Sequence, residues 1–219
     1  MTNLNNVIEI KISENDVKYF DAINFMQKRV EDLLNNKEKE LIWFLNHDHI
    51  YTCGTSYSKS EMLNITKVPI VESNRGGKIT YHGPGQRIVY LIIDLNKRKK
   101  DIKKFISLLE NTVIELLKVF EIESASHKNK VGIWITKVKK NKLLEEKKIG
   151  AIGLRIKKWI TYHGISFNIN PELSYYKNIK PCGLDNRLVT SLDECGIKIT
   201  QKEFDKMFID IFLKKLKTF

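Results

Sequence analysis

Residues 75 to 94 read RGGKITYHGPGQRIVYLIID and join a glycine-rich segment to an apolar run. The first part, Arg75 to Gln86, holds four glycines, a proline, a histidine and two basic side chains. Glycine lets the backbone approach a ligand closely and adopt positive φ, whereas Pro84 restrains the chain. The second part, Ile88 to Asp94, is a β-branched run typical of a buried strand. We therefore expect a loop of restrained conformation that directly precedes a buried strand and is suited to a binding site.

The glycine-rich segment has two other interpretations. Clusters of glycine and proline also mark ordinary surface turns, and the residues alone leave that alternative open. A phosphate-binding P-loop needs a glycine where Glu72 stands and a Ser or Thr where Ile79 stands. The spacing therefore excludes a P-loop.

Strand-like segments are spread along the whole chain. Short β-branched or alternating runs bounded by polar residues predict strands. The charged stretch 137–146 has no apolar period, so we expect it to be an exposed excursion that joins two strands. The predicted strands are 7–11, 41–45, 49–52, 68–71, 88–93, 132–135, 149–156 and 159–168.

Three segments carry apolar residues at helical spacing. The first is 16–34, in which Phe20 is expected to face the sheet, and the second is 101–120. The third begins with Thr200 and Glu203, which have the spacing of a capping box. The first two helices are predicted to pack on a sheet, and the aromatic residues of the third are expected to lie in the core.

The composition is that of a globular protein, with 42% hydrophobic and 29% charged residues. Together with the alternation of helices and strands, it predicts an α/β (α+β-like) fold in which helices flank a mixed sheet. A chain of 219 residues can bury a substantial core, so one domain, 1–219, is expected. No apolar stretch reaches the roughly 20 residues that span a bilayer, and the start lacks a signal-peptide pattern. We expect a cytoplasmic protein without a membrane segment.

The formal net charge of +12 raises the question of a nucleic-acid partner. The densest basic runs, 97–104 and 137–142, lack the interleaved aromatic residues of a single-strand platform. Solvated lysines are the preferred interpretation, and no nucleic acid is expected. A basic surface also suits an acidic protein partner, because complementary charge speeds encounter.

Cysteine and histidine spacing gives no sign of a metal site. Cys53, Cys182 and Cys195 form no CxxC pair, which fits a reducing compartment. His47 and His49 stand two residues apart but lack a companion cluster of ligands. We expect no bound metal.

A cysteine and a lysine are the candidate catalytic residues. Cys182 stands between the rigid Pro181 and the permissive Gly183, where a thiolate can be exposed. A buried, inert thiol is an equally good interpretation of these residues alone. Lys148 precedes the small-residue segment 150–153, along which a substrate chain can lie. The lysine affects the thiol only if the fold brings the two together.

Four motifs, taken in order, resemble the lipoyl(octanoyl) transferase family of the biotin/lipoate protein ligase superfamily. They are RGGKITYHGPGQ from Arg75, KIGAIGLR from Lys148, HGISFNIN from His163 and PCGL from Pro181. The likeness covers nearly the whole chain, because LNHDHIYTCG, VGIWI and VTSL are also similar to family segments. Each motif alone is weak, whereas the set is specific. The resemblance implies an acyltransferase with the catalytic-domain fold of lipoate and biotin protein ligases.

The same resemblance implies roles for individual residues. It makes Cys182 the nucleophile that forms an acyl thioester and Lys148 its activating partner. An ammonium favours a neighbouring thiolate, and a lysine can accept a proton from an attacking amine. The implied substrate-binding residues are Arg75, Gly76, Gly77, Lys78, Ile79, Thr80, Tyr81, His82, Ala151, Ile152, Gly153, His163, Gly164 and Ile165.

The resemblance also implies the partners. The donor is octanoyl-acyl carrier protein, and the acceptor is a lysine of a lipoyl domain, in the first step of endogenous protein lipoylation. Implied acceptors are the E2 subunits of 2-oxoacid dehydrogenases and the glycine cleavage H protein. No cofactor is implied.

Departures from the family pattern and two rival functions remain. Cys53 and Thr55 stand where the family usually has Leu and Arg, and 186–188 is bulkier than usual. An ATP-dependent lipoate or biotin protein ligase shares the architecture, but it forms an acyl-adenylate and needs no cysteine at position 182. A basic, non-enzymatic nucleic-acid-binding protein would bind in a salt-sensitive way and would not need that cysteine either.

Overall fold

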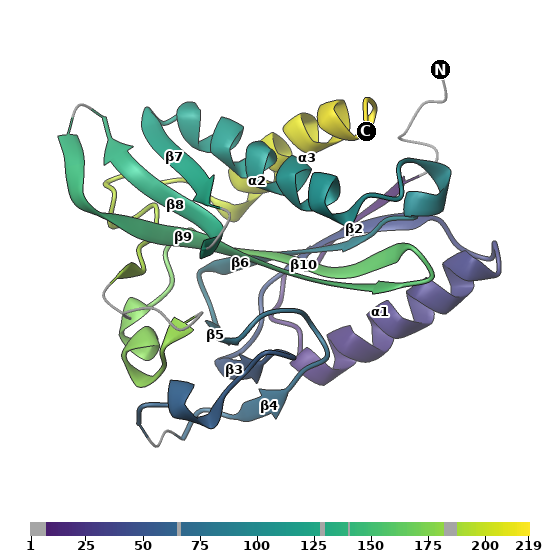
Figure 1. Ribbon diagram of the computed structural model, residues 1–219, viewed down its shortest axis with the longest axis horizontal. Helices are drawn as coiled ribbons and strands as arrows, with labels where there is room; N and C mark the ends of the chain where they lie inside the picture. The colour runs from purple at the N-terminus through teal and green to yellow at the C-terminus, as the bar shows by residue number, and fades with distance from the viewer. Residues whose placement is uncertain (1–7, 65–66, 128–129, 140, 182–187) are drawn as a thin grey trace.

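A computed structural model of the chain describes residues 8–64, 67–127, 130–139, 141–181 and 188–219. A seven-stranded sheet runs through the centre of the molecule. Helices α2 (Ile102–Lys118) and α3 (Gln201–Leu216) cover one face of this sheet, and α1 (Tyr19–Leu34) covers the other (Figure 1). The arrangement is therefore a mixed sheet between layers of helix.

The order of strands in the large sheet is β1-β2-β6-β10-β9-β8-β7. Only the β1–β2 pair is parallel, and the other neighbours in this sheet are antiparallel. A separate three-stranded sheet, β4-β3-β5, lies beside the α1 end of the molecule (Figure 1). The strands are β1 (Ile8–Ile12), β2 (Glu40–Leu45), β3 (Ile50–Cys53), β4 (Ile70–Glu72), β5 (Ile79–His82), β6 (Gln86–Ile92), β7 (Ile122–His127), β8 (Lys130–Val138), β9 (Asn141–Lys157) and β10 (Ile160–Asn168). Short 3₁₀ helices are η2 (Lys59–Glu61), η3 (Leu95–Lys97) and η4 (Leu173–Asn178).

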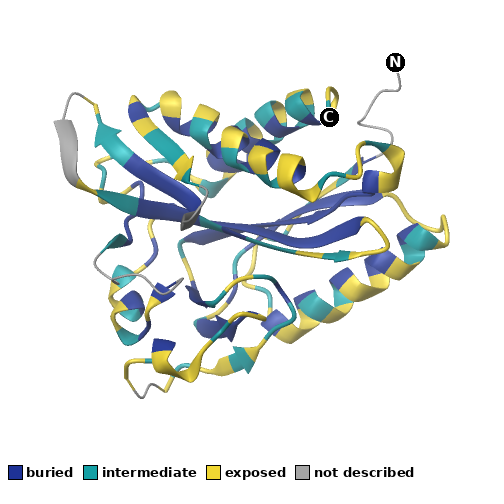
Figure 2. Cartoon of the chain, viewed as in Figure 1, coloured by how far each residue is buried: buried dark blue, intermediate teal, exposed yellow. Residues whose placement is uncertain are grey.

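The two faces of the large sheet bury separate cores, because side chains alternate between the faces of a strand. Every residue of β2, β6 and β10 is buried, as expected for central strands covered on both sides (Figure 2). On one face, Phe204 and Phe208 of α3 pack with Phe167 of β10. On the other, Met26 of α1 packs with Trp43 of β2 and its neighbours.

The predicted α/β class and mixed sheet are confirmed, and so are the three helices. Thr200 and Glu203 form the predicted capping box, in which each side chain bonds to the other residue's backbone N–H. The helix predicted over 16–34 begins only at Tyr19. Its buried stripe contains Tyr19, Ala22, Met26, Val30 and Leu33, so Phe20 lies off the stripe and is 62% exposed. The expectation that Phe20 faces the sheet was wrong.

Three strand assignments also differ from the sequence-based expectation. Strand β5 lies inside the glycine-rich segment, and β7 occurs where no strand was predicted. The stretch 137–146 is not a simple loop, because Lys137 pairs with Lys142 and Val138 with Asn141 across a β8–β9 hairpin. Ladder hydrogen bonds join backbones and need no apolar side-chain pattern, so periodicity alone did not reveal these pairings.

Among the residues that the structure describes, no helix combines the length and apolarity needed to cross a bilayer. The assignment of a single domain stays a prediction.

A buried ion pair fastens α3 to the sheet. Arg87 of β6 donates from Nε to Oδ1 of Asp205 at 2.9 Å and from Nη2 to Oδ2 at 2.6 Å. Both side chains are 3% exposed. We expect Asp205→Ala to lower the free energy of unfolding by about 3–5 kcal/mol, because the guanidinium is left buried without its counter-charge. Urea denaturation measures the change.

The control for this prediction is a more exposed ion pair that also involves α3. Lys215 contacts Glu115 at 2.6 Å, with side chains 28% and 54% exposed. Glu115→Ala should cost less than about 1 kcal/mol. Equal decreases in the free energy of unfolding for the two substitutions would contradict the larger contribution predicted for the buried pair.

Candidate active site

The site is built on a stretch of β9 that is paired on one side only. Strand β10 pairs with β9 from Gly150 to Lys157. On the opposite side, the β8 ladder reaches Gly150 and goes no further within the described residues. Beyond that point the backbone N–H of Gly76 donates to the carbonyl of Leu154 at 3.2 Å. The glycine-rich segment therefore lies along the open edge of β9.

A cavity of about 270 Å³ lies between this segment, the open edge of β9 and the first turns of α2. Its size approaches the roughly 300–1,000 Å³ of small-molecule sites. Isoleucines 79, 102, 106, 152, 156 and 165 make much of the wall apolar. Of the substrate-binding residues proposed from sequence, the cavity brings together Arg75, Gly76, Gly77, Lys78, Ile79, Thr80, His82, Ala151, Ile152, Gly153, His163, Gly164 and Ile165.

Tyr81 is the one proposed binding residue that does not line this cavity. Its ring belongs to a separate core with Tyr51 and Tyr176, and its hydroxyl contacts His49 Nδ1 at 2.7 Å. Alternation along β5 explains this placement, because Thr80 and His82 point into the cavity and Tyr81 points away.

Glycine is favoured where the segment meets the strands. A Cβ on Gly153 would lie 3.1 Å from the carbonyl oxygen of Gly76. Gly77 has a φ of 88°, which glycine adopts without steric cost. These two positions let the loop backbone lie directly against β9.

Arg75 anchors the loop with most of its donors. Its Nη2 donates to the Thr52 carbonyl at 2.6 Å and to Thr52 Oγ1 at 2.8 Å, and its Nε donates to the same hydroxyl. Its Nη1 donates to the carbonyl of Gly76 at 3.0 Å. The guanidinium thus fixes the loop to β3 and places a positive charge at the cavity wall.

Three buried histidines lie in this region, His82 and His163 near the Arg75 charge and His47 beside His82. Burial lowers the pKa of His47 to about 4, and burial together with Arg75 lowers that of His163 to about 3. Burial, with His47 and Arg75 nearby, holds the pKa of His82 well below its usual range. All three rings are therefore neutral at pH 7, and each takes part in hydrogen bonds as a neutral imidazole.

A chain of hydrogen bonds leads from the cavity towards Lys148. His82 Nδ1 contacts Gln86 Oε1 at 2.6 Å, and Gln86 Nε2 donates to Asn168 Oδ1 at 3.0 Å. Asn168 Nδ2 donates to the carbonyl of Thr190 at 2.9 Å, and Thr190 N donates to the carbonyl of Lys148 at 2.9 Å. This network holds the wall of the cavity and the backbone of Lys148 in one fixed arrangement.

Lys148 is only 5% exposed and lies on β9 beside a second, small cavity. The two cavities share Thr80, Ala151 and Ser166, so the lysine stands at one end of the larger one. Cys182 lies outside the described residues. Two described residues that flank it in the sequence, Pro181 and Val189, line the small cavity with Lys148.

Several wall residues were not found from the sequence. Tyr19 and Tyr90 line the cavity, and Ile102 and Ile106 line it from α2. The only available signal was the spacing of the two isoleucines by one helical turn, apart from the main buried stripe of α2. The tyrosines come from distant segments, and no local pattern marks them.

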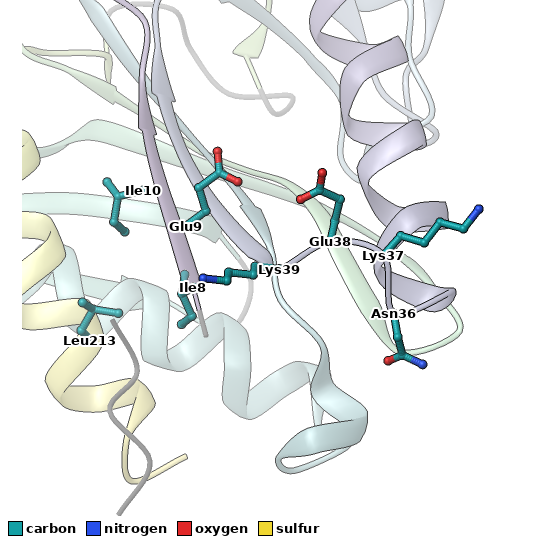
Figure 3. Close-up of a pocket in the computed structure, with 8 residues that line it drawn as sticks. All are labelled: Ile8, Glu9, Ile10, Asn36, Lys37, Glu38, Lys39 and Leu213. Atoms are coloured by element: carbon teal, nitrogen blue, oxygen red, sulfur yellow. The ribbon is translucent and has the colours of Figure 1, made fainter. Parts of the chain in front are cut away.

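A larger hollow of about 690 Å³ lies at the outer edge of β1 and shares no residue with this cavity (Figure 3). Its two carboxylates already face Arg29, with Glu9 at 2.7 Å and Glu38 at 3.6 Å from Nη1. Nothing in this hollow matches the motifs of the sequence.

A family model described as the lipoyl protein ligase A/B catalytic domain matches residues 18–213. The chain belongs to this family. The octanoyltransferase of Bartonella tribocorum is 45% identical over 202 residues, which cover 90% of this chain and 82% of the relative. The octanoyltransferase of Ehrlichia chaffeensis is 44% identical over 200 residues, with 91% of each chain covered.

Solved structures of lipoate protein ligases share the fold. A bipartite lipoate protein ligase from Thermoplasma acidophilum superposes with a TM-score of 0.69 at 14% identity, over 96% of this chain and 84% of that one. Lipoate-protein ligase A bound with ATP gives a TM-score of 0.70 at 16% identity, over 95% and 86%. The family resemblance, the ligase-like fold and the prediction of an enzyme are confirmed, whereas the roles of individual site residues stay predictions.

The buried histidines predict a loss of stability in acid. The unfolded chain takes up protons on histidine below about pH 6.5, whereas the folded protein keeps these rings neutral. The free energy of unfolding should therefore fall as the pH is lowered from 6.5 towards 4, by about 1.4 kcal/mol per pH unit for each such histidine. Urea denaturation at a series of pH values measures the slope.

His163→Asn isolates one histidine of the three. Asparagine tolerates the left-handed backbone found at this position, where φ is 59°. The variant should show a smaller slope than the wild type over the same pH range. Identical slopes would mean that His163 does not remain neutral in the folded protein.

Proposed function

We propose that this protein transfers an octanoyl group from octanoyl-acyl carrier protein to a lysine of lipoyl domains. The observation that carries the proposal is the 44–45% identity to octanoyltransferases over about nine-tenths of the chain. The apolar cavity supports it, because its wall suits a saturated chain and one end lies beside Lys148. The chain is thus an acyltransferase of lipoate metabolism.

The first half of the proposed reaction loads the enzyme. The Cys182 thiolate attacks the carbonyl carbon of the donor thioester, and the tetrahedral adduct collapses with loss of the carrier thiolate. This thiolate takes up a proton from the Lys148 ammonium, which leaves Lys148 as a neutral amine. The octanoyl group is then held as a thioester on Cys182. Backbone N–H groups along the edge of β9 and the glycine-rich segment are suited to the oxyanion of the adduct. An ammonium at Lys148 would favour the attacking thiolate.

The second half transfers the acyl group to the acceptor. The neutral ε-amine of the lipoyl-domain lysine attacks the enzyme thioester, an amide bond forms, and the Cys182 thiolate leaves. The attacking nitrogen must lose a proton, and Lys148 is the proposed acceptor of it. Lys148 returns to the ammonium form and again faces the thiolate, which completes the cycle.

The proposed partners follow from this chemistry. The donor is an acidic carrier protein, which the net charge of +12 would attract. The acceptors are the lipoyl domains of 2-oxoacid dehydrogenase E2 subunits and the glycine cleavage H protein. The reaction needs neither a cofactor nor a metal, because the donor thioester is already activated.

The loading step predicts a covalent adduct. Incubation with octanoyl-acyl carrier protein, without ATP, should raise the intact mass of the protein by one octanoyl group. Cys182→Ala should abolish both the adduct and transfer. Cys53→Ala and Cys195→Ala should retain most activity, because Cys53 is buried in another core and Cys195 packs against the α2–α3 side of the sheet. A strict requirement for ATP, with no adduct, would favour the ligase alternative.

The transfer step predicts that Lys148 cannot be replaced by arginine. Lys148→Arg keeps the positive charge, but a guanidinium does not release its proton and has a different shape. We expect severe loss of octanoyl transfer to a lipoyl domain, measured by the mass of the acceptor. Near-normal turnover would remove Lys148 from proton transfer.

A further inference from the structure

The face of β9 on which Lys148 lies is set by an irregularity in the strand. Residues two apart share a face of a regular strand, so Lys148 would share a face with Gly150 and Ile152. Ile152 belongs to the core under α2 and α3. The polar wall of the cavity, by contrast, lies on the other face, where a Cβ on Gly153 would meet Gly76 and Arg75. A regular strand would point Lys148 towards the α2 face and away from this polar wall.

A β-bulge corrects this orientation. Ile133 pairs with Gly150 and the next residue of β8, Trp134, pairs with Lys148, so Ile149 is the extra residue on β9. Bulges of this kind re-aim side chains and are common next to active sites. Ile149 stays in the core of the α2 face, and Lys148 moves to the opposite face.

On that face, Gly132 and Trp134 of β8 contact the lysine side chain, and we call these two residues the lysine seat. A Cβ on Gly132 would lie 2.5 Å from Cε of Lys148 and 2.6 Å from the carbonyl oxygen of Gly150, and the φ of Gly132 is 126°. Glycine at this position therefore leaves room both for the backbone of β9 and for the extended lysine side chain. The ring of Trp134 lies with its centroid 5.8 Å from Nζ, within the range of about 6 Å for a cation–π contact. Gly132 and Trp134 stand two apart on β8 and therefore share a face, and both are buried.

Trp134 is buried outside the apolar cluster that lies under α2 and α3. Its neighbours Ile133 and Ile135 belong to the core under α2, and Trp134 points to the other side. It is fully buried, and its ring lies near His127 at 6.4 Å and near Lys148. A large aromatic ring at this position is thus placed against the ammonium of the lysine.

We propose that Gly132 and Trp134 are positioning residues that aim the Lys148 ammonium into the site, Gly132 by leaving space and Trp134 by supporting the charge with its ring. The inference rests on the proposed function only for the role of Lys148 in proton transfer. The seat itself follows from the geometry of β8 and β9. Displacement of the ammonium by about 1 Å is enough to cost up to about a hundredfold in rate.

The experiment compares Trp134→Leu, which removes the π face, with Trp134→Phe, which retains one. Trp43→Leu is the matched control, because Trp43 is also buried and has Lys11 Nζ 5.8 Å from its ring, but it does not line the cavity. Limited acetylation with acetic anhydride, followed by peptide mass, gives the reactivity of each lysine. Thermal unfolding reports the general cost of each substitution.

Trp134→Leu should raise the acetylation rate of Lys148 several-fold relative to that of the exposed Lys158, whereas Trp134→Phe should stay close to wild type. Trp43→Leu should lower thermal stability without changing Lys148. In octanoyl transfer, Trp134→Leu should lower kcat by roughly ten- to a hundredfold with little change in KM, and Trp134→Phe should restore most of it.

The proposal would be overturned if Lys148 were acetylated at the same rate in Trp134→Leu as in the wild type. It would also be overturned if Trp134→Leu and Trp43→Leu changed the acetylation of Lys148 equally, even in an active enzyme. The acetylation result does not depend on octanoyl transfer. If the wild type transfers no octanoyl group while Trp134→Leu still releases Lys148, the seat stands and the proposed function fails.

Discussion

The candidate site depends on which neighbours form backbone hydrogen bonds with β9. One side of this strand is paired with β10 along its second half, while the pairing with β8 ends at Gly150. Backbone groups at an open edge need other partners, because an unpaired buried N–H or C=O is costly. Gly76 meets part of that need at Leu154, and the remaining gap is the cavity. The cavity therefore lies along the part of β9 that β8 leaves unpaired.

The polar side of the cavity is organised by neutral groups around a single guanidinium. The guanidinium of Arg75 donates hydrogen bonds to Thr52 and Gly76, and these bonds hold the glycine-rich loop against β3. The histidines near it remain uncharged because burial and the guanidinium both oppose their protonation. Such a satisfied network makes the wall rigid, which suits a site that must place a carbonyl group within reach of Lys148.

The lipoate ligases with the same fold show that this architecture does not fix the chemistry. One of them is solved with ATP bound, at 16% identity to this chain, whereas the octanoyltransferases resemble it at 44–45%. Function resides in the side chains placed on the fold. The difference between an acyl-adenylate and an enzyme thioester would then lie in the residue at position 182 and in how Lys148 is aimed beside it.

The sequence by itself determined the class of fold, the third helix with its capping box, the glycine-rich segment and the family, because each depends on local spacing or on motifs readable in one chain. The segments 75–82, 151–153 and 163–165, proposed from the sequence as binding residues, line one cavity apart from Tyr81, and their role in binding stays a prediction. Tertiary structure alone decided that Tyr81 points away, that Tyr19, Tyr90 and Ile102 complete the wall, and that Phe20 is exposed. It also decided the face on which Lys148 lies. A β-bulge sets the face on which Lys148 lies. Because a bulge is a change in the register between two strands, the alternation of residues within either strand does not predict it.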